Sequence, residues 1–104
     1  MKSISVLELK EMFDKKTNFT LLDVRELEEL SIAKIEQNTH IPMGEIVERI
    51  KEINIDVPVV VMCHSGVRSA RVCGYLNDNG YDAINLTGGI SSWSREIDPS
   101  IPQY

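Results

Sequence analysis

The sequence predicts an α/β fold, in which helices cover both faces of a central, mainly parallel sheet. Residues 59–62, Val-Val-Val-Met, are apolar throughout, which is typical of a strand buried on both faces of a parallel sheet. Apolar residues recur at helical spacing between the expected strands, and this alternation favours helices that cross over the sheet. A chain of 104 residues with these elements is expected to form one domain, residues 1–104.

The first part of the chain predicts one helix and one strand. Ser5-Val6-Leu7-Glu8 has the pattern of a capping box, in which a serine and a glutamate satisfy the first backbone N–H groups of a helix. That helix is expected to end at Lys15–Asn18. Phe19–Val24 is mostly apolar and predicts a strand, which the charged segment Arg25–Glu29 follows directly.

The middle of the chain is less periodic. Residues 31–43 show only a short strand signal, around His40-Ile41-Pro42. One face of a predicted helix comes next, formed by Ile46, Val47, Ile50 and Ile53.

The second half of the chain predicts a loop between a buried strand and a helix. Cys63–Arg68 is expected to form this loop, and the helix after it would turn Val72, Cys73 and Leu76 inward, with Gly80 as its C-cap. A strand, a turn and a helix should follow at Ala83–Leu86, Thr87–Gly89 and Ile90–Arg95. Ligands of such sheets bind at the carboxyl ends of the strands, where Asp23–Arg25 and Cys63 both lie.

Composition and charge exclude several classes of function. The chain has 11 basic and 16 acidic residues and a net charge of −5, so it should repel nucleic-acid phosphates. No apolar run reaches the roughly 18 residues of a membrane helix, and the first residues do not resemble a signal peptide. Two cysteines, Cys63 and Cys73, form neither a disulfide framework nor a Cys/His metal site. We therefore expect a cytoplasmic, thiol-reduced protein with no metal, nucleic-acid or membrane partner.

Cys63-His64-Ser65-Gly66-Val67-Arg68-Ser69 is the segment that carries the predicted chemistry. A tight loop here would turn backbone N–H groups inward, in front of a helix N-terminus, and Gly66 permits the positive φ that such a turn often needs. Residues 57–77 contain Arg68 and Arg71 but no Asp or Glu. Because cations and helix N-termini lower the pKa of a thiol, we expect Cys63 to be a thiolate nucleophile.

We expect different roles for Cys73 and His64, which lie near Cys63 in the sequence. Cys73 lies on the apolar stripe of the predicted helix and should be a buried core residue. His64 has the chemistry of a general base, but its loop position suits exposure to solvent equally well, so its role stays open.

Four segments in this order resemble the rhodanese-like domains, which are sulfurtransferases, and together they extend over nearly the whole chain. They are residues 21–26, Leu-Leu-Asp-Val-Arg-Glu; residues 40–42, His-Ile-Pro; the loop at 63–69; and residues 86–93, Leu-Thr-Gly-Gly-Ile-Ser-Ser-Trp. The resemblance implies that Cys63 takes a sulfane sulfur as a transient persulfide, without another cofactor. The implied donor is thiosulfate, a low-molecular-weight persulfide or a persulfide-bearing protein, and the acceptor is cyanide or a thiol.

The resemblance also implies roles for other residues. Asp23 and Arg25 would brace the loop from beneath, Gly88 and Gly89 would form a turn that approaches it, and Trp93 would be a packing anchor. The amides that surround the persulfide would come from the loop, which consists of His64, Ser65, Gly66, Val67, Arg68 and Ser69.

One segment departs from the family pattern. Family members often carry Gly-His-Ile-Pro-Gly-Ala between the Asp-Val-Arg motif and the next strand. An ungapped alignment places Ala33–Asn38 there, so that only Ile35 matches and His40 is not the family histidine. We expect this departure to change local structure and partner choice rather than sulfur chemistry.

Two other interpretations of the loop stay open. A phosphatase or arsenate reductase uses a Cys-x5-Arg loop, wide enough for a tetrahedral oxyanion, whereas four residues separate Cys63 from Arg68. Such an enzyme also needs an acid for the leaving group, and none lies nearby in the sequence. A non-enzymatic binding or sulfur-carrier module would keep the fold, although inactive members of the family generally lack the cysteine. A Cys63–Cys73 redox pair is disfavoured, because Cys73 should point into the core.

Overall fold

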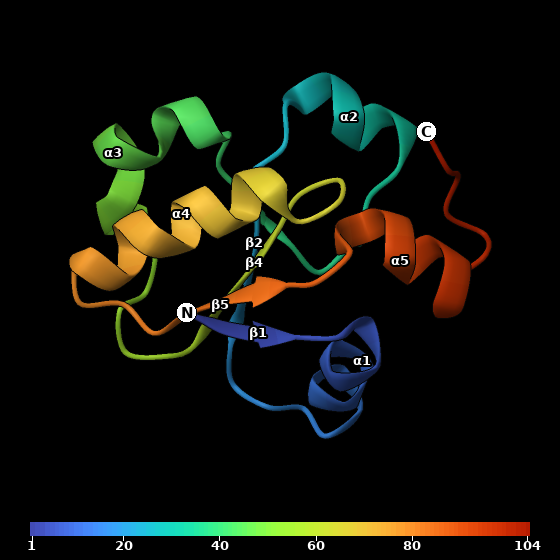
Figure 1. Ribbon diagram of the computed structural model, residues 1–104, viewed down its shortest axis with the longest axis horizontal. Helices are drawn as coiled ribbons and strands as arrows, with labels where there is room; N and C mark the ends of the chain where they lie inside the picture. The colour runs from blue at the N-terminus through green and yellow to red at the C-terminus, as the bar shows by residue number, and fades with distance from the viewer.

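The centre of the molecule is a five-stranded sheet in which every neighbouring pair of strands is parallel. The computed structural model describes residues 1–104, and Figure 1 shows helices on both sides of the sheet. The strand order is β1-β5-β4-β2-β3. Their bounds are β1 (Lys2–Ile4), β2 (Thr20–Asp23), β3 (Thr39–His40), β4 (Val59–Met62) and β5 (Ala83–Leu86). The predicted α/β class is confirmed.

Five helices cover the sheet. They are α1 (Val6–Asp14), α2 (Leu27–Ile32), α3 (Ile46–Arg49), α4 (Val67–Asp78) and α5 (Gly89–Glu96), and short 3-10 turns at Met43–Glu45 and Ile50–Glu52 flank α3. Helices α1 and α5 pack on one face, and α3 and α4 on the other. Helix α2 lies near the C-terminus and the loop that precedes α4 (Figure 1).

Alternate residues of β4 serve two separate cores, one on each face of the sheet. Val59 and Val61 pack with the α3 and α4 side, whereas Val60 and Met62 pack with the α1 and α5 side. All four side chains are fully buried, as the continuous apolar run predicts. The strand is therefore held from both sides, and Cys63 follows it directly.

The capping box predicted at Ser5 is confirmed. Ser5 Oγ accepts a hydrogen bond from the Glu8 amide at 3.2 Å, and the Glu8 carboxylate accepts one from the Ser5 amide at 3.1 Å. Helix α1 then ends before Lys15, as expected.

Two elements were not predicted. Strand β1 has only three residues, two of them exposed, and it pairs with β5 at the edge of the sheet. Helix α2 buries none of its six residues, so it has no apolar stripe for a pattern to detect. The short strand expected at His40-Ile41-Pro42 is present, one residue earlier.

Three expected boundaries are wrong. The helix expected at Ile46–Ile53 is broken into α3 and its flanking 3-10 turns, and Val47 is 66% exposed instead of facing the core. The loop expected at Cys63–Arg68 is shorter, because α4 begins at Val67. The C-cap of α4 is Asn79, and Gly80 follows it with φ +87°.

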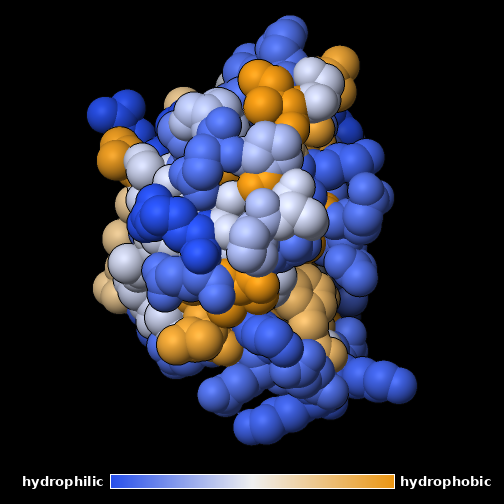
Figure 2. Space-filling model, turned by 90° about the vertical axis from the view of Figure 1, so that its right-hand side faces the viewer, coloured by the Kyte–Doolittle hydropathy of each residue, from blue (hydrophilic) through white to orange (hydrophobic).

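The side of the molecule that carries the C-terminus is mostly hydrophilic, with several apolar areas, the larger of them in the lower half of the view (Figure 2). No helix in the structure combines the length and the apolar character needed to cross a membrane.

Candidate active site

The Cys63 sulfur lies where β4 ends, beneath the loop that enters α4. Gly66 has φ +115° and is the N-cap of α4, so the chain turns back at this residue as predicted. Its amide donates to Cys63 Sγ at 3.1 Å, and Ser69 Oγ lies 3.3 Å from the same sulfur. Cys63 is 1% exposed. The sulfur thus occupies the N-terminus of α4, where backbone N–H groups have no partner within the helix.

The two cysteines differ in acidity. Burial by itself would raise the pKa of Cys63, but hydrogen bonds from the Ser69 side chain and from the amides of Ser69, Gly66 and Ser65 lower it overall. Cys73 is fully buried on the inner face of α4, as expected, and burial raises its pKa to about 11. Both thiols are free. The thiolate therefore forms more readily at Cys63.

Ser69 and Asn85 form a polar connection between the sulfur and β5. Ser69 Oγ donates to Asn85 Oδ1 at 2.5 Å, and Asn85 Nδ2 donates to the Gly66 carbonyl at 3.2 Å. A hydroxyl has one hydrogen, so while Ser69 donates to Asn85 it accepts from the Cys63 thiol. When the thiol loses its proton, the Ser69 hydroxyl can turn and donate to the thiolate instead.

The loop also caps α5. The Ile90 amide donates to the Cys63 carbonyl at 3.0 Å, and the Ser91 amide donates to the His64 carbonyl at 3.1 Å. Gly89 has φ +55°, and a Cβ placed there would lie 2.5 Å from both of these carbonyl oxygens. The turn at Gly88 and Gly89 therefore contacts the loop directly, as the sequence resemblance implies.

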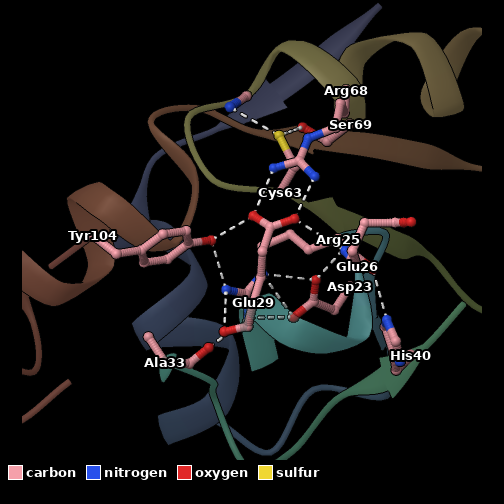
Figure 3. A network of polar contacts seen from close by, with 11 residues as sticks. Asp23, Arg25, Glu26, Glu29, Ala33, His40, Cys63, Arg68, Ser69 and Tyr104 are labelled. Atoms are coloured by element: carbon pink, nitrogen blue, oxygen red, sulfur yellow. Dashed lines mark hydrogen bonds and ion pairs between the residues drawn. The ribbon is translucent and has the colours of Figure 1, made fainter. Parts of the chain in front are cut away.

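Arg68, in the first turn of α4, forms an ion pair with Glu29 of α2. Its Nη1 and Nη2 donate to the two carboxylate oxygens of Glu29 at 2.6 and 2.9 Å (Figure 3). No hydrogen bond joins Arg68 to Cys63. The guanidinium that was expected to act on the thiolate is held by a carboxylate, and hydrogen bonds from amides and Ser69 lower the pKa of Cys63.

Asp23 and Arg25 form a fully buried ion pair under this cluster. Arg25 Nη2 lies 2.8 Å from Asp23 Oδ2, and both side chains are 0% exposed. Arg25 also donates to the Ala33 carbonyl at 2.7 Å and to Tyr104 Oη at 2.8 Å. The pair fixes α2 and the C-terminal segment, and it is connected to the loop through Glu29, which binds Arg68, and through Tyr104, which stacks on His64.

Tyr104 joins the C-terminal segment to the site. Its hydroxyl donates to Glu29 at 2.7 Å, and its ring stacks on His64 with the two ring centres 4.2 Å apart. His64 is half-buried under this ring. His40 lies elsewhere, with Nε2 2.7 Å from the Arg25 carbonyl oxygen.

The sequence matches the family described as Rhodanese-like domain over residues 5–96.

The chain belongs to the rhodanese-like domain family.

Known proteins similar to this rhodanese-like domain include sulfur-transfer proteins. A Bacillus subtilis protein named "Putative sulfurtransferase YtwF" is 39% identical over 99 residues, which cover 95% of this chain and 96% of that protein. The Allochromatium vinosum protein named "Sulfurtransferase" is 41% identical over 76 residues, covering 72% of this chain and 71% of that one. A rhodanese-like domain protein from Staphylococcus aureus has a TM-score of 0.87 and 35% identity, covering 100% of this chain and 99% of that one. The family is thus one of sulfurtransferases.

Three site residues of this rhodanese-like domain were not found from its sequence. Glu29 lies in a helix without an apolar stripe, and Tyr104 reaches the site from the far end of the chain. The residues around each of them therefore gave no indication that they belong to the site. Asn85 did have such a signal, because it is the only polar residue in the predicted strand Ala83–Leu86, and the structure shows that it is buried.

The segment that departs from the family pattern keeps a structural role. Ala33 and Ile35 are both buried, and the Ala33 carbonyl is the acceptor for Arg25 described above. The departure at Ala33–Asn38 therefore lies beside the buried ion pair and away from the sulfur.

Proposed function

We propose that this rhodanese-like domain, residues 1–104, transfers a sulfane sulfur through a persulfide on Cys63. The Cys63 thiolate attacks the outer sulfur of a donor such as thiosulfate. A new sulfur–sulfur bond forms, the donor's own sulfur–sulfur bond breaks, and sulfite leaves with the electron pair. A thiophilic acceptor such as cyanide or a thiol then takes the outer sulfur, and the Cys63 thiolate is restored. The sulfur is carried on the cysteine, so the cycle needs no other cofactor.

The observation that carries this proposal is the set of hydrogen bonds around Cys63 Sγ. The Gly66 amide and the Ser69 hydroxyl lie within 3.1 and 3.3 Å of the sulfur, and hydrogen bonds of this kind stabilise a thiolate. The same donors would hold the anionic outer sulfur of a persulfide. Arg68 and His64 are half-buried residues of the same loop, and any part that they take in the reaction is included in this proposal.

Intact mass tests the proposal. Incubation of the purified protein with thiosulfate or with an alkyl persulfide should add one sulfur atom, and cyanide should remove it with formation of thiocyanate. Cys63→Ser should gain no sulfur. Cys73→Ala should gain it normally, at a cost of about 1–2 kcal/mol in the free energy of unfolding. The proposal fails if the folded Cys63→Ser variant still accepts sulfur, or if the wild type accepts none from any donor.

A further inference from the structure

The cation nearest to the predicted donor site is already paired. Arg68 uses both terminal nitrogens on Glu29, and the two side chains are 31% and 19% exposed. This two-pronged geometry is the one by which an arginine would otherwise bind the oxygens of an anionic donor. An anion such as thiosulfate therefore competes with Glu29 for Arg68.

Glu29 is held in place from several directions. Besides Arg68, the Tyr104 hydroxyl and the Glu26 amide donate to its carboxylate at 2.7 and 3.0 Å. These hydrogen bonds, above all that from Arg68, lower the pKa of Glu29 to about 2. The carboxylate is therefore charged at any pH at which sulfur transfer is measured.

The remaining charges beside the loop leave no free cation in this cluster. Asp23 neutralises Arg25, as Glu29 neutralises Arg68. Arg71 is exposed one turn further along α4, where it lines a hollow with Met43 and Ile46 on the α3 side. The two ion pairs, Arg25–Asp23 and Arg68–Glu29, thus contribute no net positive charge where a donor would approach Cys63.

We propose that Glu29 is a specificity-determining residue, which favours alkyl persulfide donors that bring no net charge over small dianions such as thiosulfate. The inference rests on the sulfur-transfer function proposed above. In this reaction the Cys63 thiolate attacks the outer sulfur of R–S–SH and forms Cys63–S–SH. The bond between the two donor sulfurs breaks, and the electron pair leaves with R–S⁻. A neutral donor can approach the Arg68–Glu29 pair without electrostatic repulsion, whereas a dianion is repelled by the Glu29 carboxylate.

Three donors of decreasing charge test this inference: thiosulfate, benzenethiosulfonate and 2-hydroxyethyl persulfide in its protonated form. The rate of sulfur loading onto Cys63 is followed by intact mass. Glu29→Gln frees Arg68, so loading from thiosulfate should become roughly tenfold faster, loading from the monoanion should gain less, and loading from the neutral persulfide should not change. Glu28→Gln, the same charge change on an exposed residue of α2, should alter none of the three rates.

A second variant separates the charge of Arg68 from a general loosening of the loop. In Glu29→Gln combined with Arg68→Met, the gain with thiosulfate should disappear, because it depends on the freed guanidinium. An equal gain for all three donors, or a gain that survives the loss of Arg68, would overturn the inference.

The wild type supplies a measurement that needs no variant. With the charges beside the loop already balanced, loading from thiosulfate should depend only weakly on salt concentration, and a steep fall with added NaCl would also overturn the inference. If none of the three donors loads the wild type, the proposed function itself is wrong. If they load it but the rates do not follow donor charge in the Glu29 variants, only the specificity inference is wrong.

Discussion

Cys63 and Cys73 belong to the same packing cluster, but one has hydrogen-bond donors around its sulfur and the other has apolar neighbours. Burial disfavours the thiolate at both positions. At Cys63 the amides at the start of α4 and the Ser69 hydroxyl outweigh that effect. The position of a cysteine relative to a helix N-terminus therefore decides its reactivity here more than its depth in the core does.

Ser69 provides a direct test at this scale. Ser69→Ala removes the hydroxyl that can donate to the thiolate, so the pKa of Cys63 should rise and alkylation near pH 7 should become roughly tenfold slower. The measurement is the rate of reaction with iodoacetamide against pH, in a Cys73→Ala background. Ser3→Ala, on the exposed strand β1, is the control. If the rate profile of the Ser69 variant matches that of the wild type, the backbone amides alone set the acidity of Cys63.

Among the elements, helices α4 and α5 both begin beside the loop that follows β4, and the first amides of both helices donate hydrogen bonds to it. Cys63 Sγ accepts from the amide at the start of α4, while the carbonyls of Cys63 and His64 accept from the first amides of α5. Each helix N-terminus leaves N–H groups that need partners, and the loop supplies partners to both. The loop is thereby fixed to the two helices that lie on opposite faces of the sheet.

Gly89 is the residue of α5 whose backbone lies against the carbonyl groups of Cys63 and His64. In Gly89→Ala the new Cβ would lie 2.5 Å from the Cys63 and His64 carbonyls, in a backbone conformation with φ +55°. The loop must shift, so sulfur loading should fall roughly 10²-fold, with a loss of stability of about 1–3 kcal/mol.

Gly74→Ala is the matched control for that substitution. Gly74 lies inside α4 with open space where a Cβ would be, so alanine should raise the free energy of unfolding by about 0.5–1 kcal/mol and leave the loading rate unchanged. Normal loading by a folded Gly89→Ala protein would show that the loop does not depend on the start of α5.

Elements that bury a regular apolar face could be predicted from the sequence. The apolar run Val59–Met62 is such a signal, and the strand occurs there. The capping box at Ser5 is a second kind of local signal, and helix α1 begins after it as expected. Helix α2 buries no residue and had no such signal. The charged segment Arg25–Glu29 could not reveal that Glu29 binds Arg68, because that contact joins residues 39 positions apart and depends on how the helices are placed.

For the molecule as a whole, the buried pair Asp23–Arg25 should be the polar contact on which folding depends most. Asp23→Asn leaves the Arg25 charge buried beside a neutral amide, which should cost about 3–5 kcal/mol. Urea unfolding followed by circular dichroism measures this. Asp14→Asn breaks a pair in which both side chains are about half exposed and should cost less than about 1 kcal/mol. Equal losses in the two variants would contradict the structural importance of the buried pair.

The dependence of the free energy of unfolding on pH tests whether the fold lowers the pKa of Glu29. Its pKa is about 2 when folded, against an ordinary value of 4.5, so the unfolded chain takes up a proton at a higher pH than the folded one. The stabilisation by Glu29 should be complete above about pH 5 and lost as the pH falls from there toward 2. The difference in unfolding free energy between the wild type and Glu29→Gln should shrink over that range. A difference that stays constant would mean that Glu29 is not ionised preferentially in the fold.

The division of the interior into two cores affects how this protein can be observed. Trp93, the one tryptophan of the chain, packs with Phe13 in the core on the α1 and α5 side, while Cys63 and α4 belong to the core across the sheet. Tryptophan fluorescence should therefore follow global unfolding and change little when sulfur binds to Cys63. The stacked pair His64–Tyr104 lies beside the loop, so the aromatic proton resonances of these two rings would be the natural spectroscopic reporter of sulfur loading.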